Sequence, residues 1–247
     1  MEWLVPTVYA IGGALVAAFL VTWAPAMLVK YWHRQQLQWR TRGKLVLTYD
    51  DGPGPLLTSA LVELLDRYHA KASFYLVGFR ALRAPQSCDL LIEHGHDLGC
   101  HTHMHRKPWL VPPWETARDA AQGYRSMSKW LKPNAAFRPP FGKLTTWSWL
   151  VAKRRGAALS WWTCDGADTH ATLPDPGEVA RQIMNDGGAV VLLHSHDRGD
   201  DRQRYVLALT ERLLQMAREL DMKTCTMSEL LGDSTNSSQR EVHGGKT

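Results

Sequence analysis

Cysteine is scarce in this sequence, with four among 247 residues, and no two of them form a Cys-x-x-Cys pair. This spacing argues against the disulfide framework of a small secreted domain and fits a reducing compartment. Helix-turn-helix, RNA-binding and zinc-finger patterns are also lacking, so the formal net charge of +5 does not indicate a nucleic-acid partner. Internal repeats are absent from residues 44–232, and this length favours one domain with one sizeable core.

Charge is absent from the N-terminal stretch. No charged residue occurs from Trp3 to Val29, and this run exceeds the roughly 20 residues that a helix needs to cross a bilayer core. We therefore predict an anchor over residues 1–29 that forms one transmembrane helix. A cleaved signal peptide is the alternative, but Glu2 precedes the apolar run without any Lys or Arg, and Ala24-Pro25-Ala26 is a poor cleavage site.

Basic residues are concentrated just after this stretch. Five of them stand on its C-terminal side: Lys30, Arg34, Arg40, Arg42 and Lys44. Because the cytoplasmic flanks of membrane spans retain Lys and Arg, we expect a single-pass protein of the cell membrane whose globular domain faces the cytoplasm. Residues 30–43 are predicted to be a basic juxtamembrane linker, either a short interfacial helix or a solvated segment. The polar residues 233–247 predict a disordered tail.

Apolar runs alternate with helical patterns over residues 44–232. The predicted strands cover residues 44–49, 72–77, 96–100, 135–138, 157–162, 188–194 and 223–227. The predicted helices cover residues 57–69, 86–94, 114–131, 145–154, 176–186 and 201–220. This alternation is typical of an α/β fold with a parallel sheet. An open sheet is as compatible with the pattern as a distorted (β/α)7-type barrel, which is the fold that we predict.

Polar clusters follow five of the predicted strands. They read TYDDGP, HTHMH, RPPFG, CDGADT and HSHD. Each one alone is explained by a turn or by a packed or solvated histidine, since Asp-Gly-Pro is a common turn sequence. Parallel β/α folds, however, place their sites where the carboxyl ends of the strands meet. Five clusters at equivalent positions therefore predict one shared site.

The HTHMH cluster has the spacing of a metal site. His101 and His105 are four residues apart, which brings two imidazoles to one side of a helical turn. Two histidines and one carboxylate, with open coordination positions, are typical of a catalytic divalent metal. The adjacent acids Asp50 and Asp51 repel each other without a positive partner. A metal explains the pair, because one acid binds it while the other takes the proton of the attacking water.

These motifs resemble those of the polysaccharide deacetylase family, also called the chitooligosaccharide deacetylase homology domain. The resemblance covers Lys44 to about Leu231 and includes the segments ASFYLVG and GHDLGCHTHMH. It implies a metal-dependent hydrolase that removes an N-acetyl or N-formyl group from an amino sugar. The implied metal is Zn²⁺, with Co²⁺ as another candidate.

The resemblance also implies a role for each matching residue near the metal. The implied metal ligands are Asp51, His101 and His105. Asp50 matches the general base of the family, and Arg138 matches the residue that orients it.

On the leaving-group side, the resemblance makes His194 the general acid that protonates the departing amine, with Asp168 orienting this histidine and tuning its pKa. The backbone amide of Phe141, which follows Pro140, would stabilise the oxyanion; the family prefers tyrosine at this position. In an extended chain His196 shares a face with His194 and competes for the acid role or for the metal. We favour His194 because it directly follows the apolar strand.

Two tryptophans near the motif loops are candidate sugar contacts. Trp109 and Trp147 carry indole faces that stack well on sugar rings, although packing is the common role of such residues.

The sequence therefore predicts a membrane-anchored carbohydrate N-deacetylase. Its expected partners are the membrane and an amino-sugar glycan, or a polyprenyl-phosphate-linked sugar if the domain faces the cytoplasm. A catalytically inactive carbohydrate-binding protein is the main alternative, but it would not need the ionisable residues. A glycosidase would need two carboxylates roughly 5 Å or more apart across the sugar, which adjacent metal-binding acids do not provide. The sequence does not indicate an oligomeric state.

Overall fold

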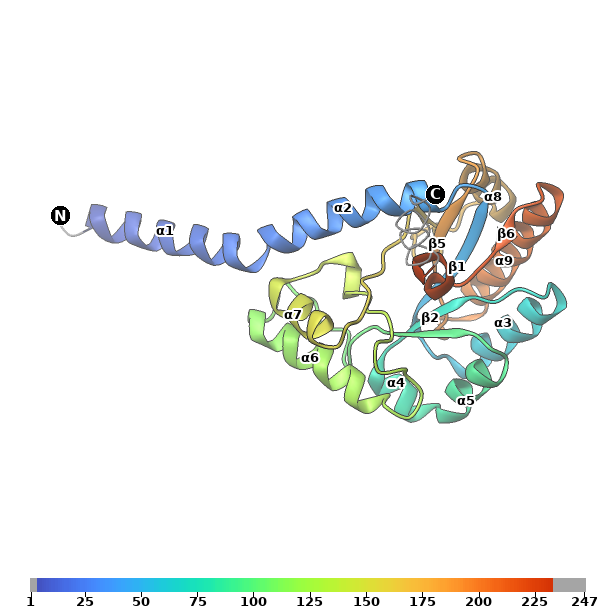
Figure 1. The fold of residues 1–247 in the computed structure, drawn as a ribbon, viewed down its shortest axis with the longest axis horizontal. Coiled ribbons are helices and arrows are strands. Elements are labelled where there is room, and N and C mark those ends of the chain that lie inside the picture. The colour runs from blue at the N-terminus through green and yellow to red at the C-terminus, as the bar shows by residue number, and fades with distance from the viewer. Residues whose placement is uncertain (1–3, 233–247) are drawn as a thin grey trace, which may run out of the picture.

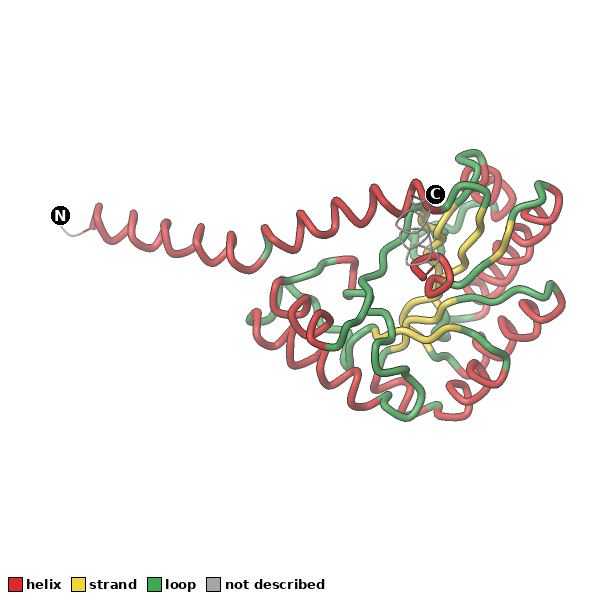
Figure 2. The backbone as a smooth tube through the Cα atoms, viewed as in Figure 1, coloured by secondary structure: helices red, strands yellow, loops and turns green. Residues whose placement is uncertain are grey.

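The computed structural model describes residues 4–232, so the predicted tail at residues 233–247 lies outside the described residues. Figure 2 shows the strands at the centre of the domain and the helices around them. The strands are β1 Lys44–Gly52, β2 Ser73–Leu76, β3 Asp97–Cys100, β4 Cys164–Asp165, β5 Ala189–His194 and β6 Lys223–Thr224. The helices of the domain are α3 Pro55–Arg67, α4 Gly78–Arg83, α5 Pro85–Glu93, α6 Pro113–Ser126, α7 Thr146–Arg154, α8 Pro176–Met184 and α9 Asp200–Glu219.

The sheet is parallel at every strand pair, which confirms the predicted α/β class. Its strands follow the order β3-β2-β1-β5-β4, and β6 pairs with β1. The central strands β1 and β5 are buried along almost their whole length, as the continuous apolar runs of a sheet covered on both faces require. In the β1–β5 register Asp50 lies opposite His194, so two of the predicted polar clusters meet at one edge.

The predicted seven-stranded barrel is not confirmed. The apolar runs at 135–138 and 157–162 form only isolated bridges in the described chain, from Phe137 to Cys100 and to Leu159. Phe137 is fully buried and Leu159 is 5% exposed, so burial and not a regular strand ladder accounts for these apolar runs. Helix α4 was not predicted, because its six residues are too few to display a helical period.

Two further helices precede the domain, α1 Leu4–Thr22 and α2 Ala24–Arg40 (Figure 1). The helical stretch Pro6–Arg40 is the one candidate membrane span among residues 4–232 by length and composition, and a signal sequence meets the same criteria. Figure 1 shows α1 extending beyond the domain, and its large apolar side chains, such as Ile11 and Leu15, are exposed. This end of the chain is therefore apolar without being part of the domain core.

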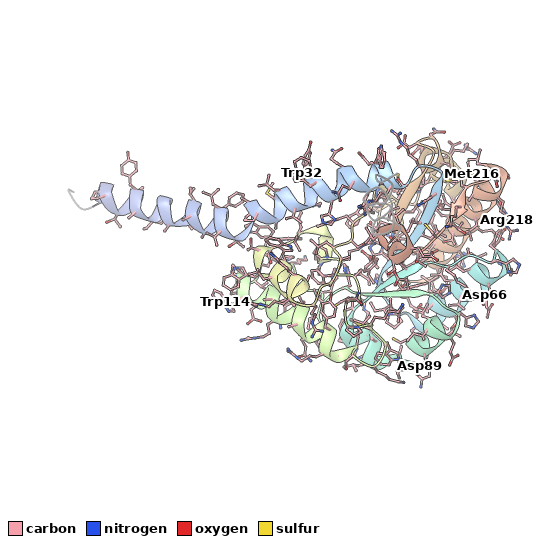
Figure 3. All side chains as sticks on the ribbon, viewed as in Figure 1. Trp32, Asp66, Asp89, Trp114, Met216 and Arg218 are labelled. Carbon is pink, nitrogen blue, oxygen red and sulfur yellow. The ribbon has the colours of Figure 1, made fainter. Side chains whose placement is uncertain are left out.

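Helix α2 packs against the domain. Leu37 is 2% exposed, the Lys30 Nζ donates a hydrogen bond to the Gly142 carbonyl at 2.8 Å, and the His33 ring lies 5.5 Å from the Trp161 ring. Trp32, which is labelled in Figure 3, is largely exposed at the edge of this contact. Residues 30–40 of the predicted linker are thus helical and held on the domain, while their contact with a membrane stays a prediction.

Candidate active site

The end of strand β1 brings two neighbouring carboxylates to the same place. Residues that follow each other along a regular strand point to opposite faces. Here the pairing register shifts between Asp50 and Gly52, and Asp51 has a φ of 63° in the left-handed region. This irregularity turns both side chains toward His101, whose Nε2 lies 3.7 Å from Asp50 Oδ2 and 3.3 Å from Asp51 Oδ1.

Asp51, His101 and His105 form the group predicted to hold a metal. One donor atom from each residue lies within 4.8 Å of the others. The His105 Nε2 lies 3.0 Å from Asp51 Oδ1, and the His101 Nδ1 donates to the Arg138 carbonyl at 2.7 Å. That hydrogen bond fixes the tautomer of His101 and leaves its Nε2 lone pair free to bind a metal.

The segment that carries the two histidines is shaped by a carboxylate that sequence reasoning missed. Asp119 on α6 is 6% exposed and accepts hydrogen bonds from the backbone amides of His103, Met104 and Arg106. In addition, the amide of His105 donates to the Thr102 hydroxyl at 3.1 Å. A polar residue on the buried face of a predicted helix was the sequence signal for Asp119.

The pKa values of the three predicted ligands shift in different directions. Burial and then the positive charge at His101 lower the pKa of His105 to about 4, so its imidazole is neutral near pH 7. Burial alone would raise the pKa of Asp51, but the contact with His101 and the charges on the neighbouring histidines hold this pKa well below its usual range. At His101, burial is outweighed by the two aspartates, which raise its pKa.

The donor set fits a divalent metal. Asp51 Oδ1 is buried and has no hydrogen-bond partner among the described residues, although the Nε2 atoms of two histidines face it. Two imidazole nitrogens and one carboxylate oxygen are the ligand types of a catalytic zinc site with an open position. Residues 4–232 thus bring together all three predicted ligands.

Arg138 is fully buried beneath Asp50. Its Nη1 donates to Asp50 Oδ1 and to the Thr48 hydroxyl, both at 2.8 Å. Its Nη2 donates to the Ser160 hydroxyl at 3.0 Å and to the Trp161 carbonyl at 3.1 Å. These four bonds fix the guanidinium, and therefore the orientation of the carboxylate that it holds.

His194 and Asp168 form the second predicted pair. The His194 Nδ1 donates to Asp168 at 3.0 Å, and the backbone amide of His194 donates to the same carboxylate at 3.1 Å. Burial alone would lower the pKa of His194, but the hydrogen bond and charge of Asp168 raise it above its ordinary value. Arg198, which was not predicted, also donates to the fully buried Asp168, at 2.5 Å.

The two remaining histidines of the motif loops differ from His194. His196 Nδ1 lies 3.9 Å from Asp51 Oδ2 without a hydrogen-bond partner in the described chain, and burial and Arg80 lower its pKa to about 3. His103 Nδ1 lies 2.9 Å from the Ser126 hydroxyl, on the α6 side of its loop. Of these three histidines, His194 is therefore the one whose pKa is raised by a carboxylate that it contacts.

Of the predicted oxyanion and sugar-contact residues, Pro140, Phe141 and Trp109 lie near His105, whereas Trp147 does not contact the site in the described chain. Pro140 and Phe141 lie in a short 3-10 turn, and the Phe141 ring lies 4.7 Å from the His105 ring. Trp109 is half exposed, and its ring lies 5.1 Å from that of Phe141, so it borders the site. Trp147 is exposed on α7, and we find no ring contact or hydrogen bond between it and a site residue within residues 4–232.

Sequence reasoning also missed two arginines around the site. Arg80 on α4 donates to the Asp51 carbonyl at 2.5 Å, and Arg202 on α9 donates to the Asp168 carbonyl at 2.5 Å. Both contacts hold the backbone of a site residue. They join segments far apart in the chain, so no local spacing reveals them.

Comparison with known sequences places the chain in one family. A family model described as polysaccharide deacetylase matches residues 39–160. A peptidoglycan-N-acetylglucosamine deacetylase of Bacillus cereus is 30% identical over 189 residues, which cover 76% of this chain and 87% of that protein. The chain therefore belongs to the polysaccharide deacetylase family, as its motifs predicted.

More distant relatives are named for two glycans. The peptidoglycan-N-acetylglucosamine deacetylase PgdA of Listeria monocytogenes is 24% identical over 78% of this chain, which matches only 40% of that longer protein. A chitooligosaccharide deacetylase of Bradyrhizobium is 26% identical over 63% of this chain and 73% of its own length.

Solved structures show the same fold. The Bc1960 peptidoglycan N-acetylglucosamine deacetylase superimposes with a TM-score of 0.69 at 20% identity, covering 76% of this chain and 88% of that one. BA3943, a CE4 family pseudoenzyme from Bacillus anthracis, gives 0.66 at 19% identity, covering 77% of this chain and 66% of that one. Because active and inactive proteins share the fold, it does not by itself define the activity.

Proposed function

We propose that this chain is a metal-dependent N-deacetylase that removes an N-acetyl or N-formyl group from an amino sugar in a polysaccharide, an oligosaccharide or a lipid-linked glycan. One observation carries the proposal. The donor atoms of Asp51, His101 and His105 lie within 4.8 Å of one another, and the register of β1 and β5 places Asp50 opposite His194 beside them. This arrangement supports a metal site flanked by a base and an acid.

The three ligands would hold Zn²⁺ or another divalent metal such as Co²⁺. When bound, the metal supplies Lewis acidity that polarises the amide carbonyl and lowers the pKa of water. In this proposal the backbone amide of Phe141 donates to the developing oxyanion, and Pro140 lies in the same turn. Trp109 and Trp147 remain our candidates for stacking on the sugar.

Two side chains would move protons. Asp50 accepts a proton from the attacking water as the water oxygen bonds to the acyl carbon, and Arg138 keeps this carboxylate in position. His194 then donates its Nε2 proton to the amide nitrogen as the carbon–nitrogen bond breaks. Asp168 holds the opposite ring nitrogen, so the proton faces the leaving group. The products are acetate or formate and a free amine.

We further propose that α1 anchors the protein in the cell membrane and that the domain faces the cytoplasm. Support comes from the exposed apolar side chains of α1 and from the basic residues that follow it. A reporter fused to the C-terminus of the intact protein tests this orientation. A cytoplasmic signal favours a polyprenyl-linked substrate, and an exterior signal refutes the orientation and favours a wall glycan.

The main test of the activity measures acetate released from N-acetylated glycans by the zinc-loaded full chain. His105→Asn keeps a residue that tolerates the φ of 53° at this position but removes the imidazole ligand. His69→Asn is the matched control, because His69 is exposed and has a φ of 52°. We expect the first variant to lose metal and activity and the control to keep both.

A carbohydrate-binding protein without activity is the alternative, since one structural neighbour is a pseudoenzyme. Glycan binding by the zinc-loaded chain, without release of acetate or formate from any acylated sugar, would favour this alternative. Against it stand the hydrogen bonds that orient Asp50 and His194, which binding alone does not require.

A further inference from the structure

A groove of about 510 Å³ lies between α2 and the loop that follows Phe141. The α2 side chains that line it are spaced by three or four residues, which places them on one face of the helix. The groove is lined from both sides by Trp23, Met27, Lys30, Arg34, Trp109 and Lys143. It therefore joins the N-terminal helices to the site.

The charge of this groove is entirely positive. Lys143 and Arg34 lie close enough to Lys30 to repel its ammonium group. No carboxylate within residues 4–232 pairs with any of the three, and the one hydrogen bond found at their charged ends runs from Lys30 to the Gly142 carbonyl. Like charges one helical turn apart are destabilising unless they are compensated. Three converging cations without a carboxylate favour an anionic ligand.

An apolar groove of about 380 Å³ adjoins the cationic one and shares Trp23 and Trp109 with it. Its walls come from the last turns of α1 and from the loop before α6, and they include Ala18, Phe19 and Val111. Here the exposed apolar surface of α1 continues onto the domain. An acyl or prenyl chain that lies along α1 would enter the domain at this point.

Two ring contacts connect the cationic groove to a predicted metal ligand. Trp109, which lines both grooves, lies 5.1 Å from the Phe141 ring, and that ring lies 4.7 Å from the His105 ring. Lys30 bonds to the residue that directly follows Phe141. An anion in the groove and an amide at the metal site would thus be near neighbours, as they are when both belong to one sugar residue.

We propose that this groove binds the phosphate of a membrane lipid that carries the amino sugar. The lipid chain follows the apolar groove along α1, the phosphate contacts Lys30, Arg34 and Lys143, and the sugar presents its N-acyl group to the metal ligands. This inference rests on the proposed function and narrows its substrate to a lipid-phosphate-linked amino sugar.

A binding measurement tests the groove without any turnover. The full chain in detergent is titrated with polyprenyl phosphate, and the complex is quantified by native mass spectrometry. The variant R34Q/K143Q removes two groove charges. K132Q/R154Q removes two exposed charges outside the groove that form no ion pair within residues 4–232, so it is the matched control.

We expect the dissociation constant to rise about tenfold or more in the groove variant and to stay unchanged in the control, since a lost charge-assisted contact weakens binding by at least that factor. Inorganic phosphate and phosphatidylglycerol are titrated in parallel. Equal affinity for inorganic phosphate would mean a free-phosphate site, and equal affinity for phosphatidylglycerol would mean a general membrane contact. Either result overturns the proposal.

A turnover measurement separates this inference from the proposed function. For an N-acetyl amino sugar linked to polyprenyl phosphate, kcat/KM should fall about tenfold in the groove variant. For a neutral N-acetylated chitooligosaccharide it should stay within about twofold. A wild-type chain that hydrolyses neutral glycans without binding polyprenyl phosphate overturns the inference and leaves the proposed function standing. Binding of polyprenyl phosphate without turnover of any substrate supports the groove and refutes the proposed function.

Discussion

Replacing Asp168 by Asn isolates the contribution of one buried charge to the proposed acid. The substitution keeps the shape of a side chain that is fully buried and that accepts two hydrogen bonds from His194 and one from Arg198. In the wild type, the carboxylate raises the pKa of His194 against the opposing effect of burial. Without it this pKa falls, so His194 is less often protonated at neutral pH.

The expected loss in kcat/KM is about 10²- to 10⁴-fold, the typical contribution of a general acid or base. The alkaline limb of the pH profile should also move to lower pH, so the loss is larger at pH 8 than at pH 6. The free energy of unfolding should fall by about 1.5–3 kcal/mol, because Arg198 loses a charged hydrogen-bond partner.

The assay follows acetate release across pH in the zinc-loaded full chain, together with thermal unfolding. Asp165→Asn is the matched control, because this exposed carboxylate bonds to the Ala167 amide in the same loop and does not contact His194. An alkaline limb in Asp168→Asn at the wild-type pH would refute the reasoning. In that case the loss of activity would come from misfolding or from another acid.

Three further substitutions test other parts of the site. Asp50→Asn should keep bound zinc and lose about 10²- to 10⁴-fold in kcat, since it removes the proposed base; wild-type acetate release would contradict this role. His101→Ala should lose zinc, measured by elemental analysis after dialysis, because it removes a buried residue that we propose as a ligand; full zinc content would exclude His101 as a ligand. Arg138→Met should lower the free energy of unfolding, measured in urea, by about 3–5 kcal/mol, because it leaves the buried carboxylate of Asp50 without its partner. A change below about 1 kcal/mol would mean that the buried pair contributes little.

The site could be predicted from sequence where its residues follow strands. The carboxyl ends of parallel strands meet at one edge, so Asp50 after the first predicted strand and His194 at the end of the sixth were expected at the same edge, where they lie opposite each other. The HTHMH spacing also predicted two imidazoles on one side beside a carboxylate, and they do lie beside Asp51. The expected helical turn was wrong, however, because Thr102 and His105 have positive φ and the segment is a loop. In these cases two things were sufficient to predict the neighbours: the order of the residues along the chain, and the rule that parallel strands end at one edge of the sheet.

The supporting contacts could not be predicted in this way. Asp119 holds the histidine loop from a helix that follows it, and Arg198 reaches Asp168 from the loop before α9. Helical periodicity indicates that Asp119 is buried, but the partners of such residues depend on how helices pack against the sheet, which periodicity does not encode. The apolar run around Phe137 shows the same limit, because a buried bridge and a buried strand have the same composition.

The rigid attachment of α2 has a geometric consequence for where the reaction takes place. A catalytic domain on a flexible tether sweeps a volume whose radius grows with the length of the linker. Here Leu37 is buried in the domain, Lys30 is bonded to the Gly142 loop, and the Thr146 hydroxyl donates to the Val21 carbonyl at 2.7 Å. The proposed metal ligands therefore keep a fixed height above the end of α1. If α1 lies in a bilayer, the protein works in a thin layer parallel to the membrane, and it meets its substrate by lateral diffusion in two dimensions.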